Sequence, residues 1–311
     1  GSSRLAQTRI QTVLLDSHSK PDQQLFSALP NMATDRYSLA DQVARFERAK
    51  AEKNERYLNI SSVYKSEDIA SRVKGKHFLV VGASRGLGLD ITKRLVADGA
   101  AVTATARKST DALDKAGVSQ IITDIEVTDN GCFTKMCGQI SEALDFVIFN
   151  AGYFPDIVDN LDSMQDAEAL NQINICALGP LRCVAALKQA GLLATKPPLV
   201  VISSQAGSAA WRSTQNKDRG GDYGHHMSRA ACNIGAALMS EELKPMGVPV
   251  VMLHPGFNRT EMTAKYSHIW DKEGAVAPEE GAMRVVYEVS KVTMESTGKF
   301  INCEDGLEIP F

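Results

Sequence analysis

His77-Phe-Leu-Val-Val-Gly82-Ala-Ser-Arg-Gly86-Leu-Gly88 is the stretch of this 311-residue chain that decides its fold. The residues before Gly82 form an apolar run of strand length, and a helix-length segment follows the glycines. A pyrophosphate can bind at a helix N-terminus only where side chains leave the backbone accessible, as glycines do. The strand–turn–helix context therefore predicts a dinucleotide-binding turn. Its predicted cofactor-contacting residues are Gly82, Ser84, Arg85, Gly86, Leu87 and Gly88.

Strand-like and helix-like segments alternate along the rest of the chain. Apolar or β-branched runs lie at 102–106, 120–125, 146–150, 199–203 and 249–254, and helix-length segments lie at 86–98, 166–190 and 225–243. Buried strands that alternate with helices are typical of a parallel sheet covered on both faces. We therefore expect an α/β fold, a Rossmann-type doubly wound parallel sheet of about seven strands, with an N-terminal helical extension.

The glycine spacing, GxxxGxG, resembles that of the short-chain dehydrogenase/reductase family rather than the GxGxxG type. Three later stretches, each after a predicted strand, also resemble family motifs: Asn150-Ala151-Gly152, Ser203-Ser204-Gln-Ala-Gly207 and Pro255-Gly256-Phe-Asn-Arg-Thr260. The ending Gly-Lys-Phe-Ile…Asp-Gly-Leu-Glu-Ile-Pro-Phe resembles the C-factor-like branch. The resemblance implies that Asn150, Ala151 and Gly152 shape the floor of the cofactor site. It also implies that Pro255, Gly256 and Thr260 line the nicotinamide.

The residues after the second strand indicate that the cofactor is NADP. An NAD enzyme usually carries an acid there to hold the ribose 2′-hydroxyl, whereas this chain has Arg107 and Lys108, and Arg85 lies inside the glycine turn. Such cations can pair with a 2′-phosphate, although they could instead be solvated surface charges. Glu126 falls roughly where the family places an acidic group near the adenine, and Asp124 is the alternative.

The resemblance also implies a catalytic Asn, Ser, Tyr and Lys, of which this chain keeps two. Ser204 fits the serine, and Asn174 fits the asparagine, although Asn171 lies one turn away. Aligning Ser228-Arg229-Ala-Ala on the branch's YxxSK element puts His225 at the Tyr position and Arg229 at the Lys position. We prefer this register because Tyr223, the alternative, has a methionine rather than a cation four residues later.

The altered pair leaves two functions open. Imidazole can exchange protons near neutral pH, and Arg229 keeps the positive charge, which favours an NADP-dependent oxidoreductase that interconverts a carbonyl and an alcohol. Loss of Tyr and Lys favours the alternative, a catalytically inactive NADP-binding protein that acts as a regulatory or structural partner. Aromatic and apolar residues near the motifs favour an apolar or aromatic small-molecule substrate, unless they only pack a lid: Tyr153, Phe154, Trp211, Phe257 and Met262.

The chain divides into an N-terminal extension, residues 1–66, and an NADP-binding domain, residues 67–311. Residues 1 to about 35 are polar and read as a tail, a loop or a transit-peptide remnant. An amphipathic helix is expected at about 38–56, with Glu52 and Arg56 as a favourable i,i+4 pair. Its apolar stripe is predicted to be Leu39, Val43 and Phe46.

Composition excludes several other functions. A formal charge of -3 gives no basic field for nucleic acid, and no run of 18 apolar residues suggests a membrane span. The six cysteines lack metal-ligand spacing, so we expect no metal and a reducing, cytoplasmic location, or organelle import if residues 1–31 are a transit remnant. Family resemblance implies a homodimer through the helices that carry Asn174 and Arg229. The candidate packing face, or else a buried core face, is Cys176, Ala177, Leu181 and Ala185.

Overall fold

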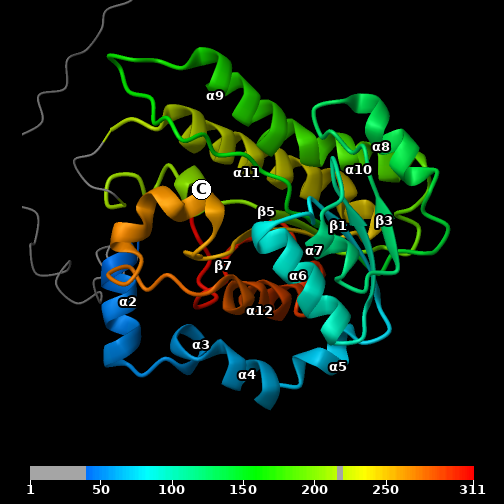
Figure 1. Cartoon of the computed structure of the whole chain (residues 1–311), viewed down its shortest axis with the longest axis horizontal. Coiled ribbons are helices and arrows are strands. Elements are labelled where there is room, and N and C mark those ends of the chain that lie inside the picture. The colour runs from blue at the N-terminus through cyan, green and yellow to red at the C-terminus, as the bar shows by residue number, and fades with distance from the viewer. Residues whose placement is uncertain (1–39, 216–219) are drawn as a thin grey trace, which may run out of the picture.

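A computed structural model describes residues 40–215 and 220–311 and contains one seven-stranded parallel sheet (Figure 1). The strand order is β3-β2-β1-β4-β5-β6-β7, and every neighbouring pair is parallel. This arrangement confirms the predicted doubly wound fold. The strands are β1 (His77–Val81), β2 (Ala101–Thr105), β3 (Gln120–Ile122), β4 (Phe146–Phe149), β5 (Leu199–Ile202), β6 (Val250–His254) and β7 (Phe300–Asn302).

Helices cover both faces of the sheet because successive strand residues point to opposite sides. In β1, Leu79 joins the core beneath one helical layer, while Phe78 and Val80 join the core beneath the other. Figure 1 shows α6 and α12 on one side of the sheet and α9, α10 and α11 on the opposite side. The longer helices of the domain are α6 (Gly86–Ala97), α8 (Asn130–Cys137), α9 (Asp166–Ile173), α10 (Gly179–Gln189), α11 (Tyr223–Leu243) and α12 (Pro278–Val289).

The direction of the strand order reverses between β1 and β4. Open α/β sheets bind ligands at such a switch point, beyond the carboxyl ends of the strands. The glycine turn follows β1, the Asn150 segment follows β4, and the Ser204 and Pro255 segments follow β5 and β6. All the motif residues after these four strands therefore lie at one edge of the sheet.

The described residues before β1 form four short helices rather than one long one. They are α2 (Gln42–Ala51), α3 (Glu55–Leu58), α4 (Ile60–Ser66) and α5 (Ile69–Val73). The predicted helix at 38–56 was therefore too long. It begins after Asp41, whose side chain accepts the Ala44 N–H, and ends before Lys53, which has a left-handed φ of 52°.

The predicted apolar stripe of this helix was wrong where the structure describes it. The side chains that α2 buries are Gln42, Arg45 and Ala49, whereas Val43 and Phe46 stay partly exposed. Leu39, like the predicted tail at 1–35, lies outside the described residues. The polar face is buried because the domain offers it a buried acid, as described below.

The predicted Glu52–Arg56 pair was also wrong. Arg48 pairs with Glu52 at 2.8 Å, and Arg56 pairs instead with Glu288 of α12. The break after α2 accounts for the difference, because Glu52 and Arg56 no longer lie on one continuous helix.

One continuous helical stretch of the described residues, Asp166–Gln189, has the length and hydropathy of a possible membrane span. It comprises α9, a π-helical turn at Asn174–Leu178, and α10. Its segments pack against α8 and α11 within the domain, so we interpret it as a core helix.

Candidate active site

The glycine turn after β1 lies directly against the segment after β4. The Asn150 side-chain amide donates to the Gly82 carbonyl oxygen at 2.9 Å. A Cβ on Gly82 would lie 2.7 Å from Ala151 Cα, and one on Gly88 would lie 2.1 Å from the Gly82 oxygen. Both positions therefore require glycine, because a side chain would push the two segments apart.

The N-terminus of α6 is open for an anion. Arg85 is the N-cap residue, and its side chain makes no capping hydrogen bond within the described structure. Gly86 has φ +54°, and no described atom lies within 4 Å of the Cβ that it lacks. Backbone N–H groups without a side-chain cap, next to open space, fit the pyrophosphate of a dinucleotide.

The cations predicted for the 2′-phosphate are exposed and weakly paired. Arg85 contacts Glu261 at 3.1 Å, and Arg107 contacts Glu126 at 3.7 Å. Exposed pairs of this kind contribute about 0–1 kcal/mol, so a phosphate could displace them. Lys108 is also exposed. The structure thus places Glu126 beside Arg107.

Ser204 begins the short turn that follows β5. Its Oγ accepts the Ala206 N–H at 3.2 Å, and the residue is partly exposed. The neighbouring Ser203 hydroxyl is buried and donates to Asn233 of α11 at 2.5 Å. The turn therefore presents Ser204 at the sheet edge while Ser203 anchors it to α11.

His225 lies in the first turn of α11. Its ring packs against Phe154 with a centroid separation of 4.3 Å, and its Nδ1 is buried without a hydrogen-bond partner in the described residues. Burial, then the nearby charge of Arg229, lowers the pKa of His225 well below its ordinary value. His225 is therefore neutral at pH 7.

Arg229 lies one turn further along α11 and points into the domain. Its Nη1 donates to the Ile202 carbonyl oxygen at 3.2 Å, at the end of β5. A Cβ on Gly152 would lie 2.9 Å from Arg229 Nη2, so the glycine makes room for the guanidinium. The structure thus brings the predicted floor after β4 and the predicted cation of α11 together.

His226 has a defined tautomer. Arg212 can only donate, so His226 Nε2, 3.1 Å from Arg212 Nη1, accepts. The ring proton then lies on Nδ1 and is donated to the Ala206 carbonyl oxygen at 2.7 Å. His226 therefore joins α11 to the Ser204 turn.

The Pro255–Thr260 segment depends on a buried carboxylate. Glu304 Oε1 accepts the Phe257 N–H at 3.2 Å, and a Cβ on Gly256 would lie 2.6 Å from Glu304 Cγ. Burial raises the pKa of Glu304, but Arg45, Arg284 and His254 oppose this effect and bring it to about 2. Sequence reasoning missed Glu304, because only its distant partners set it apart from the neighbouring acids Asp305 and Glu308.

Asn174 lies in the π-helical turn between α9 and α10. Its Oδ1 accepts from Arg182 Nη2 at 2.7 Å, and Arg182 Nη1 also contacts the Val127 carbonyl oxygen at 3.3 Å. In the same turn, Cys176 Sγ lies 3.7 Å from the Tyr153 carbonyl oxygen, beside the segment after β4. The structure thus ties Asn174 to α10, and its catalytic role stays a prediction.

Lys265 is a further polar group that the sequence did not single out. Its ammonium lies 3.5 Å from the centroid of the Phe154 ring, whose own neighbour is His225. It donates to the Pro155 carbonyl oxygen at 2.6 Å. The segment after the Pro255 motif therefore places a cation beside the aromatic wall of the site.

Comparison with known proteins decides the family, since the short chain dehydrogenase family model matches residues 76–269. The chain belongs to the short-chain dehydrogenase family. The 1-hydroxy-2-glutathionyl-2-methyl-3-butene dehydrogenase of Rhodococcus sp. (strain AD45) is 28% identical over 71% of this chain and 94% of its own length. The C-signal protein of Myxococcus xanthus is 31% identical over 54% of this chain and 93% of its own length.

Solved structures of the short-chain dehydrogenase fold match as well. The NADPH-bound carbonyl reductase from chicken fatty liver has a TM-score of 0.64 and 23% identity, covering 76% of this chain and all of its own. The carbonyl reductase Sniffer of D. melanogaster has a TM-score of 0.64 and 20% identity over the same shares. The predicted family resemblance is thus confirmed. The assignment of His225 and Arg229 to the Tyr and Lys positions stays a prediction.

The contact at Gly88 gives a direct test of the glycine turn. Gly88→Ala should destabilise the protein by about 1–3 kcal/mol, because the new Cβ must displace the Gly82 carbonyl and the Asn150 amide. Thermal unfolding measures the change. Gly138→Ala is the matched control, since its Cβ would meet backbone oxygens only at an ordinary 3.6–3.7 Å. Equal melting temperatures for the two variants would contradict the close packing of Gly88 against Gly82 and Asn150.

Proposed function

We propose that this protein is an NADP-dependent oxidoreductase that interconverts a carbonyl and an alcohol by hydride transfer. The observation that carries the proposal is the convergence of four family motifs on the open N-terminus of α6, at one sheet edge. The protein at this edge offers N–H groups for a pyrophosphate and a buried histidine within the first turn of α11. The relatives' names support the reaction class, since two of the similar structures are carbonyl reductases.

The residues present fit NADP. The open space at Gly86 and the N–H groups of α6 would hold the pyrophosphate, and Arg85, Arg107 and Lys108 would hold the 2′-phosphate. Pro255, Gly256 and Thr260 would line the nicotinamide, on the segment that Glu304 holds. When bound, the nicotinamide supplies or accepts the hydride, while this chain's own groups must move the proton.

His225 is our proposed proton-transfer group, with Ser204 positioning the substrate oxygen. A neutral imidazole suits the base that removes the alcohol proton during oxidation. In carbonyl reduction the same ring must first be protonated, which its lowered pKa disfavours at neutral pH. Arg229 supplies positive charge at the floor of the site.

One observation favours the alternative, a catalytically inactive NADP-binding protein. Arg229 is buried and donates to the Ile202 carbonyl oxygen, so part of its fork already serves the fold. In this alternative, the protein would bind NADP without turnover and act as a regulatory or structural partner of another protein. Turnover assays on a panel of carbonyls and alcohols separate the two functions.

The substrate we propose is a small, apolar or aromatic carbonyl or alcohol. Phe154 and Tyr266 stack with a centroid separation of 6.2 Å beside His225, and Met262 is exposed on the segment after Thr260. Such a wall favours apolar ligands with a few polar contacts. We also propose a reducing, cytoplasmic location, since the six cysteines are free and buried.

The cofactor prediction concerns Arg107, which follows β2. The native protein should bind NADPH at least 10-fold more tightly than NADH, because one charge-assisted pair is worth about 1.5–3 kcal/mol. Arg107→Asp should remove most of this preference. Fluorescence titration with both cofactors measures it. Equal affinities for the two cofactors in the native protein would contradict the assignment of NADP.

The proton-transfer prediction concerns His225. His225→Phe should lower turnover by about 10²–10⁴-fold while NADPH affinity stays nearly unchanged. Reduction should speed up as pH falls below 6.5, because only the protonated ring can donate and burial lowers its pKa. Oxidation should stay fast above that pH. Steady-state kinetics in both directions measure these profiles.

Tyr223→Phe is the control for His225, because Tyr223 also lies in the first turn of α11. We expect it to keep turnover within a few-fold of the native value. If Tyr223→Phe abolishes turnover and His225→Phe does not, the other register is correct.

We further propose a homodimer that pairs through α9 and α11. Of the two alternatives for the face drawn from the sequence, a buried core face holds for Cys176 and Ala177, whereas Leu181 is partly exposed and Ala185 is exposed. A better face consists of large apolar side chains that are exposed on α9, on the π-helical turn after it and on α11: Leu170, Leu178, Met227, Ile234 and Leu238.

The assembly prediction uses Leu238, which is 66% exposed. Leu238→Glu should convert the dimer to a monomer, since an unpaired carboxylate would be buried in the interface. Light scattering at micromolar concentration measures the mass. Met246→Glu, on a different surface turn, should leave the dimer intact. A native protein that is already monomeric would refute the proposal.

A further inference from the structure

The N-terminal helix α2 inserts two polar side chains into the domain. Gln42 and Arg45 are 8% and 2% exposed, although α2 precedes the residues that the family model matches. A buried cation is retained only where charge and hydrogen bonds satisfy it. The partners of Arg45 therefore indicate what this helix does.

Arg45 joins the β5 turn to the C-terminal segment. Its Nη2 donates to Gln205 Oε1 at 2.7 Å and contacts Glu304 Oε2 at 3.3 Å. Gln205 directly follows Ser204, and Glu304 follows β7. One guanidinium thus contacts both sides of the proposed active site.

Gln42 strengthens the same junction. Its Nε2 donates to Glu304 Oε1 at 2.9 Å and to the Tyr57 hydroxyl at 3.0 Å. Glu304 Oε1 in turn accepts the Phe257 N–H, in the segment proposed to line the nicotinamide. The path from α2 to the nicotinamide segment therefore consists of Gln42 or Arg45, Glu304 and Phe257.

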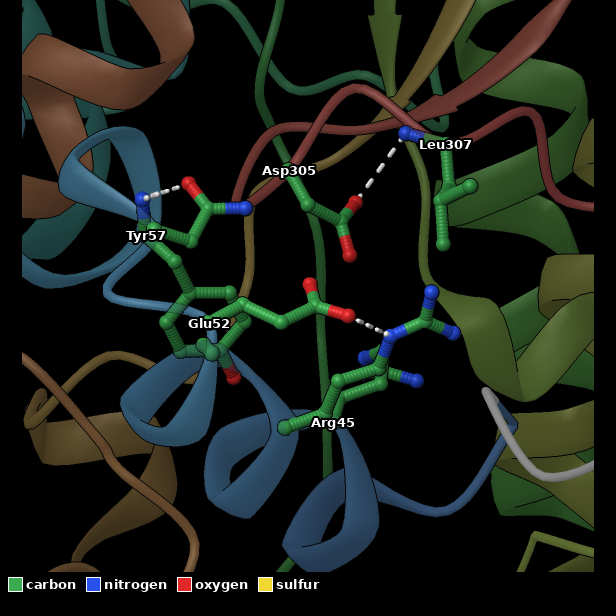
Figure 2. A pocket seen from close by; sticks show the side chains of 8 residues that line it. Arg45, Glu52, Tyr57, Asp305 and Leu307 are labelled. Atoms are coloured by element: carbon green, nitrogen blue, oxygen red, sulfur yellow. Dashed lines mark hydrogen bonds and ion pairs between the residues drawn. The ribbon is translucent and has the colours of Figure 1, made fainter.

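A pocket of about 170 Å³ lies beside α2, lined by Arg45, Tyr57, Asp305 and Leu307 among others (Figure 2). Within it Asp305 accepts the Leu307 N–H at 3.0 Å, so the C-terminal turn is held by its own bonds. Among the described contacts, Gln42 and Arg45 join α2 to the site through Glu304 and Gln205.

We propose that Arg45 is a positioning residue for the reaction, holding the Ser204 turn and the Pro255–Phe257 segment in register through Gln205 and Glu304. The inference rests on the proposed function and deepens it. Arg45 precedes the matched residues 76–269 and Glu304 follows them, so the contact joins the N-terminal extension to the turn after β7. Removing the guanidinium leaves Glu304 with Arg284, whose Nη1 lies 3.6 Å from its Oε1.

The test compares Arg45→Met with Arg48→Met. Arg48 lies on the same helix but pairs with Glu52 at the surface. In Arg45→Met we expect kcat to fall about 10–100-fold, while KM for NADPH and its dissociation constant change less than about threefold, because the phosphate contacts lie at β1 and β2. The emission of bound NADPH, which reports on the nicotinamide surroundings, should also change. Arg48→Met should match the native protein in every measurement.

Two further variants keep the test informative if Arg45→Met folds poorly. Arg45→Lys keeps the charge and loses the planar fork, so we expect an intermediate kcat at a nearly native melting temperature. Arg45→Met leaves Glu304 paired with Arg284, so its melting temperature should fall less than that of Glu304→Gln, which leaves both buried cations without a carboxylate. A kcat that simply follows the melting temperature across these variants would show a merely structural role and overturn the proposal.

The pH profile gives an independent readout. The native Glu304 has a pKa of about 2 and stays ionised across the working range. Without Arg45 burial dominates, so the pKa rises and kcat should acquire a new loss on the acidic side. An unchanged profile with unchanged NADPH emission would overturn the proposal. If the native protein binds NADPH without turnover, the proposed reaction fails, and the emission comparison alone decides the role of Arg45.

Discussion

The backbone after β1 touches the backbone after β4, and the rest of the site depends on this contact. Gly82 permits this contact, because a Cβ there would lie only 2.7 Å from Ala151 Cα. The Asn150 side chain holds the two segments together by donating to the Gly82 carbonyl oxygen. The two strands are the neighbours at which the sheet reverses its order. The helices that follow these two strands therefore cover opposite faces of the sheet, which leaves a crevice above the N-terminus of α6. The same segment after β4 contains Gly152, whose lack of a side chain makes room for the Arg229 guanidinium.

A second centre, at β6 and β7, is electrostatic. Glu304 is fully buried, and isolated it would be costly, but Arg45 and Arg284 lie beside it. The two cations outnumber the acid, and burial together with these cations lowers the pKa of His254 to about 3 despite the opposing charge of Glu304. His254 therefore remains neutral, directly before Pro255. The segment after β6 is thus anchored by an ion cluster rather than by apolar packing, which makes its position sensitive to single side chains.

The sequence predicted the elements whose signals are local. Strand runs, the glycine turn and the motifs after β4, β5 and β6 each identify themselves within about ten residues, and the parallel sheet follows from their alternation. The face of α2 could not be predicted in this way. Apolar periodicity pointed to Val43 and Phe46, whereas the buried partner of Arg45 lies 259 residues away. The direction of the Asn174 side chain could not be predicted either, because Asn174 lies in a π-helical turn. Such a turn changes which side chains face inward, and the sequence does not signal it.

The replacement of tyrosine by His225, which we propose, would change what a neighbouring cation does. A tyrosine has an unperturbed pKa near 10, so a positive neighbour brings it closer to neutral pH and makes it a better proton-transfer group. An imidazole starts near 6.5, and the same charge moves its pKa away from neutral pH, as burial and Arg229 both do here. Arg229 cannot therefore help His225 as the family's lysine helps tyrosine. What it can do is keep the ring unprotonated and able to accept a proton from an alcohol. The proton must then leave quickly, because the site disfavours imidazolium. In the proposed pair, the lowered pKa leaves the ring unprotonated for alcohol oxidation but makes it a weaker base, and carbonyl reduction needs a medium acidic enough to protonate it.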